Sequence, residues 1–379
     1  MAVTTSPDTT QFAQRATPRL RKRVARSLDD VDAWEGSWRD LEDGTESPFA
    51  EFAWSRACLS AFPAATTPHF VAGFADQELA ALVPLVKCRK RGVCRLFSPG
   101  DGQLFEPIEW PRINERVLAQ SLRSVANRGW PLELERVRTD SETLRAVTRA
   151  YRGRGIVVTR PQRPSPYIAL DESWLTPDHR LALAARDELA QARHVAEQFG
   201  PVSTEIHTPD LRELAELLDT AIDVESRTAA PAAKDLGFLA SVRIGGATVP
   251  LARDPQQMVF YRQYARAACI DGTLRICFLR LGDAVAAMQL AVEQADAFWL
   301  LRSGFDARFA DAAPSQLLTH ETIRYAAEAG LQSYEFGNVV DQWTGSWTTT
   351  GHDCVSLRTY PFGFRGVAAV AMDHFAGLV

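Results

Sequence analysis

The sequence predicts an α/β fold of the α+β type, in which a mixed, largely antiparallel sheet flanked by helices occurs twice. In each half, strands are followed by a helix and a further strand, and the two helices end at Gly129 and Gly330. These glycines, and the middle strands that begin at Leu79 and Ala284, are about 200 positions apart in both cases, which indicates a duplicated unit. The 379 residues, 46% of them hydrophobic and 23% charged, suit about two globular domains.

The first half begins with a polar tail. Residues 1–27 are rich in Thr and Arg and have no hydrophobic period, so we expect a disordered tail there. Its basic run RLRKRVAR, from Arg19 to Arg26, is more typical of a solvated segment than of a nucleic-acid site. The pattern then predicts helices at 29–41, 52–62 and 115–127 and strands at 69–74, 79–87, 93–97 and 131–137.

The second half follows a proline-stiffened connector at 161–167. Helices are predicted at 177–199 and 211–225, followed by a long irregular segment at 228–255. The turn at Gly282 and Asp283 joins strands at 274–281 and 284–292, and a third strand follows at 298–303.

The segment from Ala297 to Asn338 carries the strongest functional indication. Pro314 suits the first turn of a helix that ends at Gly330. The N–H groups of Ser315, Gln316, Leu317 and Leu318 would then face outward at the positive end of the helix dipole, where a pyrophosphate could bind. An ordinary packing helix would have a similar pattern.

Composition narrows the class of protein further. The net charge of −5 gives no general attraction to nucleic acid, so we expect no nucleic-acid partner. The chain contains neither an apolar run of about 20 residues nor the apolar core of a secretory signal, so we expect a cytoplasmic protein without a membrane partner. The six cysteines have no metal-ligand spacing, so we expect reduced thiols and no metal.

The ordered elements resemble the FemAB-related branch of the GNAT acyltransferases, also described as BioF2-like or CelD-like. The resemblance runs from Trp54 to Phe364 and is strongest from Gln256 to Asn338; LVPLV at Leu82 and SPYIAL at Ser165 also match. It implies two tandem GNAT-like domains, 28–164 and 165–379, with a helical insertion at 177–225 in the second. The second domain would bind acetyl-CoA or another acyl-CoA and transfer the acyl group to an amine of a small molecule or sugar.

Three positions depart from the family pattern. Ser315 stands where relatives place a glycine, and two expected lysines are replaced near Thr228 and at Gln342–Trp343. Two alternatives therefore stay open: a FemX-like aminoacyl-tRNA-dependent transferase, and a non-catalytic GNAT-fold binding protein. The sequence does not indicate the oligomeric state.

Two carboxylates are candidates for the base that accepts the amine proton. Asp306 follows a strand just before the proposed phosphate helix, and Glu225 lies at a helix end. The alternatives are a turn-forming aspartate and a helix-surface glutamate. Arg308 could offset phosphate charge.

Four further residues are candidates for acceptor binding. Gln289 lies in an otherwise apolar strand, where it faces either the substrate cleft or solvent. Tyr261 has a helical spacing that also suits core packing, and Asn338 and Trp343 follow the last strand, where a cleft or an ordinary surface loop would form.

Overall fold

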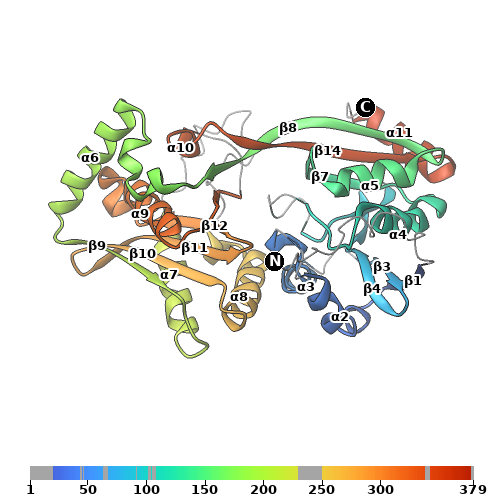
Figure 1. Ribbon diagram of the computed structural model, residues 1–379, viewed down its shortest axis with the longest axis horizontal. Coiled ribbons are helices and arrows are strands. Elements are labelled where there is room, and N and C mark those ends of the chain that lie inside the picture. Colours follow the sequence, from blue (N-terminus) through green and yellow to red (C-terminus); the bar gives the residue numbers. More distant parts are fainter. Residues whose placement is uncertain are drawn as a thin grey trace, which may run out of the picture.

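A long two-stranded arch joins two halves of the molecule (Figure 1). The computed structural model describes residues 20–42, 45, 47–62, 67–90, 92–100, 104, 108–228, 250–337 and 342–376. The arch consists of β8 (Gly155–Ala169) and β14 (Gly351–Pro361), which pair antiparallel over most of their length.

The N-terminal half contains two three-stranded sheets, in the orders β1-β3-β4 and β2-β5-β6, with helices packed against them. The strands are β1 (Arg21–Ala25), β2 (Thr67–Pro68), β3 (Phe70–Ala75), β4 (Glu78–Val83), β5 (Val86–Lys90), β6 (Val93–Phe97) and β7 (Glu133–Arg138). The helices are α1 (Leu28–Asp32), α2 (Glu35–Glu42), η2 (Pro48–Ala50), α3 (Phe52–Ala61), α4 (Glu115–Asn127) and α5 (Glu142–Tyr151).

The basic run near the N-terminus is a strand, so the prediction of a disordered tail was wrong for residues 21–27. β1 pairs antiparallel with β3 over all five of its residues, which satisfies its backbone polar groups. Ala25 is buried in a hydrophobic core while the basic side chains before it stay in solvent. Ser27 then caps α1 with a capping box. Residues 1–19 lie outside the described part of the chain.

An eight-stranded sheet runs through both halves, in the order β7-β14-β8-β13-β12-β11-β10-β9, and its strands from β13 to β9 form the base of the C-terminal half. Its further strands are β9 (Val202–His207), β10 (Leu274–Leu281), β11 (Ala284–Gln294), β12 (Ala297–Phe305) and β13 (Ser333–Glu335). The helices that follow β8 along the chain are η4 (Glu172–Leu175), η5 (Pro177–His179), α6 (Leu183–Glu197), α7 (Leu214–Ser226), η7 (Leu251–Arg253), α8 (Pro255–Ile270), η8 (Ala307–Ala312), α9 (Pro314–Glu328), α10 (Gln342–Gly345) and α11 (Phe364–Phe375).

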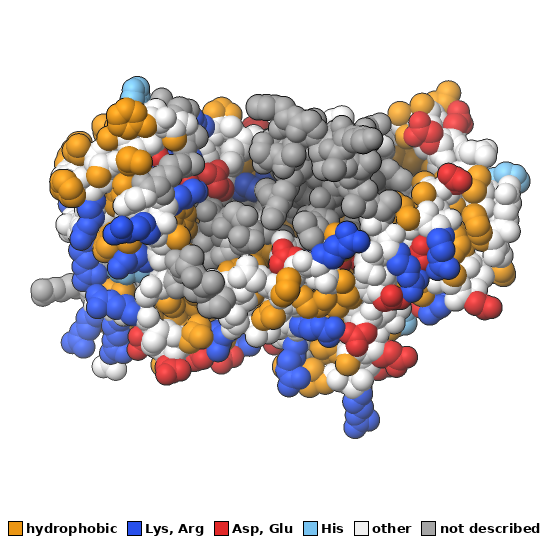
Figure 2. All heavy atoms as spheres, turned by 180° about the vertical axis from the view of Figure 1, so that it is seen from behind, with side chains coloured by type: hydrophobic (Ala, Val, Ile, Leu, Met, Phe, Trp, Pro, Cys, Tyr) orange, Lys and Arg blue, Asp and Glu red, His pale blue; other side chains and the backbone are white. Residues whose placement is uncertain are grey.

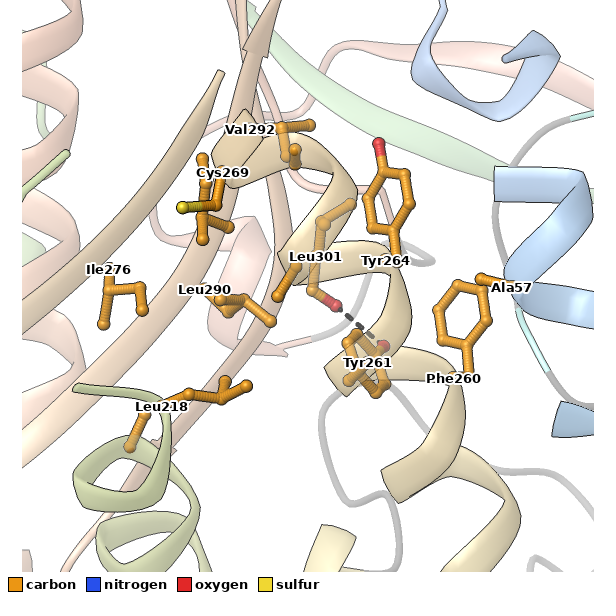
Figure 3. Packing of buried hydrophobic residues seen from close by; sticks show 14 of the residues in the cluster. Ala57, Leu218, Phe260, Tyr261, Tyr264, Cys269, Ile276, Leu290, Val292 and Leu301 are labelled. Atoms are coloured by element: carbon orange, nitrogen blue, oxygen red, sulfur yellow. Dashed lines mark hydrogen bonds between the residues drawn. The ribbon is translucent and has the colours of Figure 1, made fainter. Parts of the chain in front are cut away.

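Both faces of this sheet are covered, with α7 and α8 on one face and α6 and α9 on the other (Figure 1). Because side chains alternate along a strand, β11 contributes Met288 and Leu290 to the first core and Ala287 and Ala291 to the second. Figure 3 shows the first core, where Tyr261 of α8 lies against Leu301 of β12 and Phe260 lies on the other side of the helix, beside Ala57 of α3. The predicted α/β class is therefore confirmed.

The repeated order of elements is also present. α4 and α9 are each followed by a glycine in the left-handed region, Gly129 with φ 68° and Gly330 with φ 75°. The strand after each helix then runs parallel to a strand before it: β12 with β13, and in the N-terminal half a bridge from Leu96 to Leu132. Each half thus contains a parallel strand pair connected through a helix.

The predicted domain boundary at residue 164 needs correction. It falls inside β8, and β14 and α11 belong to the N-terminal half because β14 pairs with β7. α11 is attached there through fully buried groups: the carboxylate of Asp373 accepts hydrogen bonds at 2.7 and 2.8 Å from Arg95 of β6, and Tyr360 donates to it at 2.8 Å. The sequence prediction missed this return because it depends on pairing between residues more than 200 positions apart.

The predicted helical insertion at 177–225 is interrupted by a strand. Its first part is a 3-10 turn at Pro177–His179 followed by α6, and β9 pairs antiparallel with β10 before α7 begins. Ile206 packs against the second core, so a short edge strand with little apolar content was sufficient to extend the sheet.

Candidate functional site

The parallel pair β12 and β13 and the helix α9 between them form the first part of the candidate site. The two strands are paired from Ala297 and Ser333 to Trp299 and Glu335. Beyond this pair, Gly337 has φ 67°, and a Cβ placed there would lie 3.0 Å from the carbonyl oxygen of Leu300. Glycine therefore permits the chain to turn beside β12 at this point.

α9 begins as predicted, at Pro314, but its start offers fewer free amides than expected. Ala313 precedes it with φ 41° and provides no side-chain cap. The N–H group of Ser315 makes no hydrogen bond to a described residue, whereas those of Gln316 and Leu317 donate to the carbonyl of Ala313 at 2.9 and 3.3 Å. Leu318 lies one residue further into the intrahelical ladder. The predicted set of free N–H groups was therefore wrong for Gln316, Leu317 and Leu318, because the hydrogen bonds of the helix begin at the carbonyl of Ala313.

A pocket of about 80 Å³ lies beside this helix start, between α6, α9 and the segment after α10. Leu181, Leu189 and other small or apolar residues form most of its wall. The indole of Trp347 donates to the side-chain oxygen of Gln316 at 2.8 Å, which positions that glutamine at the pocket. Glu188 also lines it, so an anion bound there would meet a carboxylate, and Ser315, whose N–H is free, lies next to the lining residue Gln316.

Asp306 is not available as a base. Its carboxylate is buried and accepts hydrogen bonds from Arg308 at 2.6 Å and from Arg227 at 3.0 Å. These arginine contacts, with that of Arg308 the largest, hold the pKa of Asp306 well below its usual range. The residue also caps η8 by accepting from the backbone N–H of Arg308, which is the turn-forming role. Arg308 is exposed, and its charge is already matched by Asp306.

Glu225 lies inside the α7–α8 core, which contradicts the helix-surface alternative. Its side chain is 4% exposed and forms an ion pair with Arg302 of β12. Its second oxygen accepts from the backbone N–H of Leu251 at 3.0 Å. Arg302 also donates to the side-chain oxygen of Gln257 at 2.9 Å. Since both carboxylate oxygens have partners, the geometry supports a structural role over proton transfer.

Gln289 is fully buried under α9, so neither a cleft nor a solvent position was correct. Its amide nitrogen donates to Thr319 at 2.9 Å, and its carbonyl oxygen accepts from Thr322 at 2.9 Å. These bonds attach α9 to the middle of the sheet. The buried amide of Gln289, in an otherwise apolar strand, therefore anchors a helix to the sheet.

The remaining predicted acceptor residues do not form a described site. Tyr261 is buried; its hydroxyl donates to the carbonyl of Leu301 at 3.4 Å, and Arg302 lies over its ring at 5.3 Å. This is the core-packing alternative. Asn338 lies outside the described residues, and of Trp343 only the backbone, within α10, is described.

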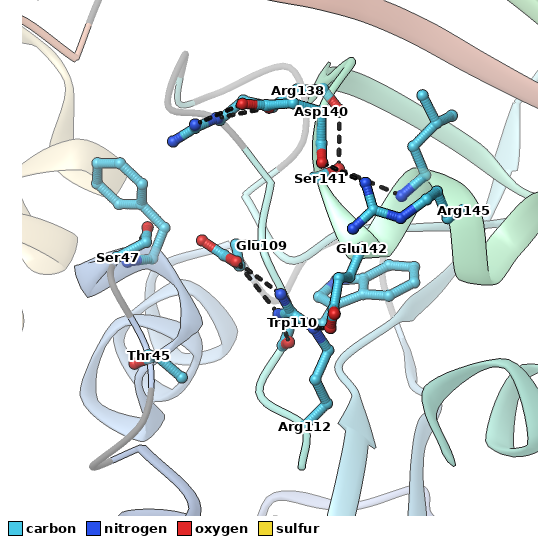
Figure 4. A network of polar contacts seen from close by, with 12 residues as sticks. Thr45, Ser47, Glu109, Trp110, Arg112, Arg138, Asp140, Ser141, Glu142 and Arg145 are labelled. Atoms are coloured by element: carbon cyan, nitrogen blue, oxygen red, sulfur yellow. Dashed lines mark hydrogen bonds and ion pairs between the residues drawn. The ribbon is translucent and has the colours of Figure 1, made fainter. Parts of the chain in front are cut away.

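A polar cleft of about 370 Å³ lies where the two halves meet (Figure 4). Trp299 of β12 and His352 of β14 contribute to its wall, so the cleft adjoins the end of the β12–β13 ladder. Its charges are arranged in pairs: Arg112 donates to Glu142 at 2.6 Å, and Arg138 to Asp140 at 2.9 Å. Its polar lining residues are Thr45, Ser47, Glu109, Arg112, Arg138, Asp140, Ser141, Glu142, Arg145 and His352.

His352 and Glu335 form a His–carboxylate pair in this cleft, which the sequence interpretation missed. Nε2 of His352 lies 3.2 Å from a carboxylate oxygen of Glu335, which is buried. The ring of Tyr167 is stacked on the imidazole, with centroids 4.1 Å apart and planes 9° apart. If Nε2 carries the proton, the lone pair is on Nδ1, which has no partner among the described residues. His352 is the second residue of β14 and belongs to no motif, so only the pairing of β14 and β13 with β8 brings it beside Glu335.

Neither a metal-binding cluster nor a membrane-spanning helix occurs among the described residues. No cluster of three or more His, Cys, Asp or Glu side chains within them is arranged to hold a metal ion. None of their helices has the length and apolar character to cross a membrane. The six cysteines have no disulfide, in agreement with the prediction of free thiols.

The parallel ladder, the connecting helix and the strands around them define the class of protein as a GNAT fold. Residues 184–344 match the sequence model of the acetyltransferase (GNAT) domain. No curated protein matches the sequence. Among solved structures, FemX is 11% identical with a TM-score of 0.52, and the match covers 90% of this chain and 97% of FemX. A conserved protein of unknown function from Bacteroides thetaiotaomicron VPI-5482 is 11% identical with a TM-score of 0.51, covering 89% and 98% of the two chains.

Residues 184–344 therefore carry a GNAT domain, and the predicted resemblance is confirmed for this segment and, through FemX, for the fold of most of the chain. The chain contains two GNAT-like units.

Proposed function

We propose that the chain is an N-acyltransferase that transfers an acyl group, in the first instance acetyl, from acyl-CoA to a small polar amine. The observation that carries the proposal is the pair Trp299–Glu335 at the end of the parallel ladder. Trp299 lines the polar cleft, and Glu335 forms a pair with His352, which lines the same cleft. The helix that connects the two strands begins at Pro314 without a cap. Donor and acceptor sites would thus meet at one end of one strand pair.

The helix start fits an anionic donor group in part. The free N–H of Ser315 and the helix dipole favour a diphosphate, and the apolar pocket wall suits an alkyl chain. Glu188 opposes the diphosphate, and no lysine lines the pocket. We therefore expect weak CoA binding that improves when the carboxylate of Glu188 is removed.

The cleft residues would supply the proton transfer. The amine nitrogen attacks the thioester carbonyl, a C–N bond forms, the C–S bond breaks and the thiol leaves. Nδ1 of His352 would accept the proton that the amine loses and return it to the departing sulfur. Glu335 would keep the imidazole in the correct tautomer through Nε2. Arg138 and Arg145, which line the cleft, would bind an anionic group of the acceptor.

The experiment measures acetyl-CoA-dependent release of free thiol by the purified chain with a panel of amino acids, amino sugars and polyamines. His352→Gln should lower kcat by about 10²–10⁴-fold and leave the melting shift caused by CoA unchanged, since it removes only the proton acceptor. His194→Gln is the matched control, because His194 lies exposed on α6.

Three outcomes would contradict the proposal. Full activity of His352→Gln would remove that residue from the reaction. Absence of any CoA-induced melting shift, together with amine-dependent consumption of aminoacyl-tRNA, would favour the aminoacyl-tRNA-dependent transferase. Ligand binding without turnover of either donor would favour the non-catalytic binding protein.

A further inference from the structure

Helix α11 exposes an apolar face to solvent. Its inner side, at Ala369 and Asp373, is buried against the N-terminal half. On its outer side Phe364 is 89% exposed, Val367 67% and Phe375 84%. These residues are three, eight and eleven positions apart, so they lie along one side of the helix. Large aromatic side chains this exposed are unusual on a soluble surface and indicate a partner.

Two neighbouring segments extend this face. Phe362, directly before the helix, is 67% exposed, and Ile156 at the end of β8 is 55% exposed. The backbone N–H of Phe362 donates to the carbonyl of Arg154 at 2.7 Å, which places the turn before α11 against the loop after α5. The apolar face therefore covers the outer end of the arch, and Figure 2 shows hydrophobic side chains gathered at this end of the molecule with Lys and Arg beside them.

Arginines surround the apolar face. Arg365 lies on α11 itself, stacked on Trp130 at 4.2 Å, and donates to the carbonyl of Arg128 at 2.8 Å. Arg152 and Arg154 lie on the loop before β8. The guanidinium groups of Arg152, Arg154 and Arg365 form no ion pair with a described residue, in contrast to the paired arginines of the polar cleft.

The three segments that carry this face and its arginines contain a single acidic residue. In residues 126–130, 150–156 and 361–376 the acidic residue is Asp373, which is fully buried with Arg95. The face is thus apolar at its centre and cationic at its rim. An anionic partner with an apolar interior would match both parts.

We propose that this face docks on an anionic membrane surface, with the aromatic side chains of α11 inserted at the headgroup level and the arginines bound to lipid phosphates. A helix that lies in the membrane interface combines these two features. A second copy of the chain is a poorer occupant, because pairing two such faces would bring unpaired arginines together. The proposal does not depend on acyl transfer, since the polar cleft is lined by other residues.

The test is sedimentation of the full chain with vesicles. We expect binding to vesicles of equal parts phosphatidylglycerol and phosphatidylcholine, little binding to phosphatidylcholine alone, and loss of binding as salt is raised. Phe364→Ser combined with Phe375→Ser should weaken binding by about tenfold or more, because both rings leave the interface. Arg152→Glu combined with Arg365→Glu should abolish the preference for phosphatidylglycerol.

The control is Leu183→Ser on α6, which removes a side chain that is 71% exposed but distant in sequence from α11. It should bind vesicles like the unchanged chain. The proposal is overturned if the unchanged chain does not bind anionic vesicles, or if the control and the double phenylalanine variant lose binding equally. It is also overturned if analytical ultracentrifugation shows a dimer that the phenylalanine variant disperses, without vesicle binding by either.

Discussion

Replacing Glu225 with glutamine distinguishes a structural from a catalytic role for this carboxylate. The substitution keeps the shape of the side chain, so it opens no cavity, but it leaves the guanidinium of Arg302 buried without its counter-ion. Breaking a buried ion pair in this way costs about 3–5 kcal/mol. Gln257 at 2.9 Å and the ring of Tyr261 at 5.3 Å still contact the guanidinium. We therefore expect the free energy of unfolding to fall by about 3 kcal/mol, at the lower end of this range.

This loss should be measured by urea unfolding and by calorimetry. At about 2–4 °C for each kcal/mol in a domain of this size, Tm should fall by roughly 6–12 °C. Glu216→Gln on the same helix is the matched control, since Glu216 is exposed, and it should change Tm little. Replacing both members by apolar residues, Glu225→Leu with Arg302→Met, should recover most of the stability.

A different pattern would refute this reasoning. If Glu225→Gln lowers the free energy of unfolding by less than about 1 kcal/mol, the pair behaves as a solvated one. If kcat then falls strongly at unchanged stability, Glu225 returns as a candidate for the base.

Three further predictions follow from the described contacts. Glu188→Gln should tighten CoA binding about two- to tenfold by removing a carboxylate beside the helix start, whereas Glu197→Gln should not, as isothermal titration would show. Burial raises the pKa of Glu51 to about 8, so ionisation of its carboxyl opposes folding increasingly as pH rises from about 4.3 to about 8. The Tm of the Glu51→Gln variant minus the Tm of the unchanged chain should therefore increase from about pH 5 to about pH 8. An equal Tm difference at the two pH values would contradict the raised pKa of Glu51. Gly337→Ala should cost roughly 1–2 kcal/mol in urea unfolding because φ is 67° and a Cβ would meet the Leu300 carbonyl; a neutral effect would show that this turn relaxes freely.

Local signals in the sequence predicted the elements well. Pro314 and Gly330 marked both ends of α9, and Gly282 with Asp283 marked the hairpin between β10 and β11. Each signal acts through the backbone of a few adjacent residues, so it needs no knowledge of the fold. The same is true of Gly129 after α4, on which the repeat was based.

The candidate site was less predictable because its chemistry depends on distant partners. Asp306 and Glu225 have the residue type that a base needs, but Glu225 is paired with Arg302, 77 positions away. Asp306 is paired with Arg308 beside it and with Arg227, 79 positions away. His352 becomes a candidate only because two strands pair with β8 and bring it beside Glu335. A histidine without a motif gives no sign of such a neighbour in the sequence.

The arch formed by β8 and β14 makes the halves interdependent. The N-terminal unit receives its last strand and helix from residues 351–376, so a chain that stops before Gly351 would leave β7 and the outer part of β8 unpaired. It would also leave Arg95 buried without Asp373. Dividing the chain at a single position should therefore not give either unit in folded form. Fusion partners are better attached through flexible linkers that leave α11 unchanged.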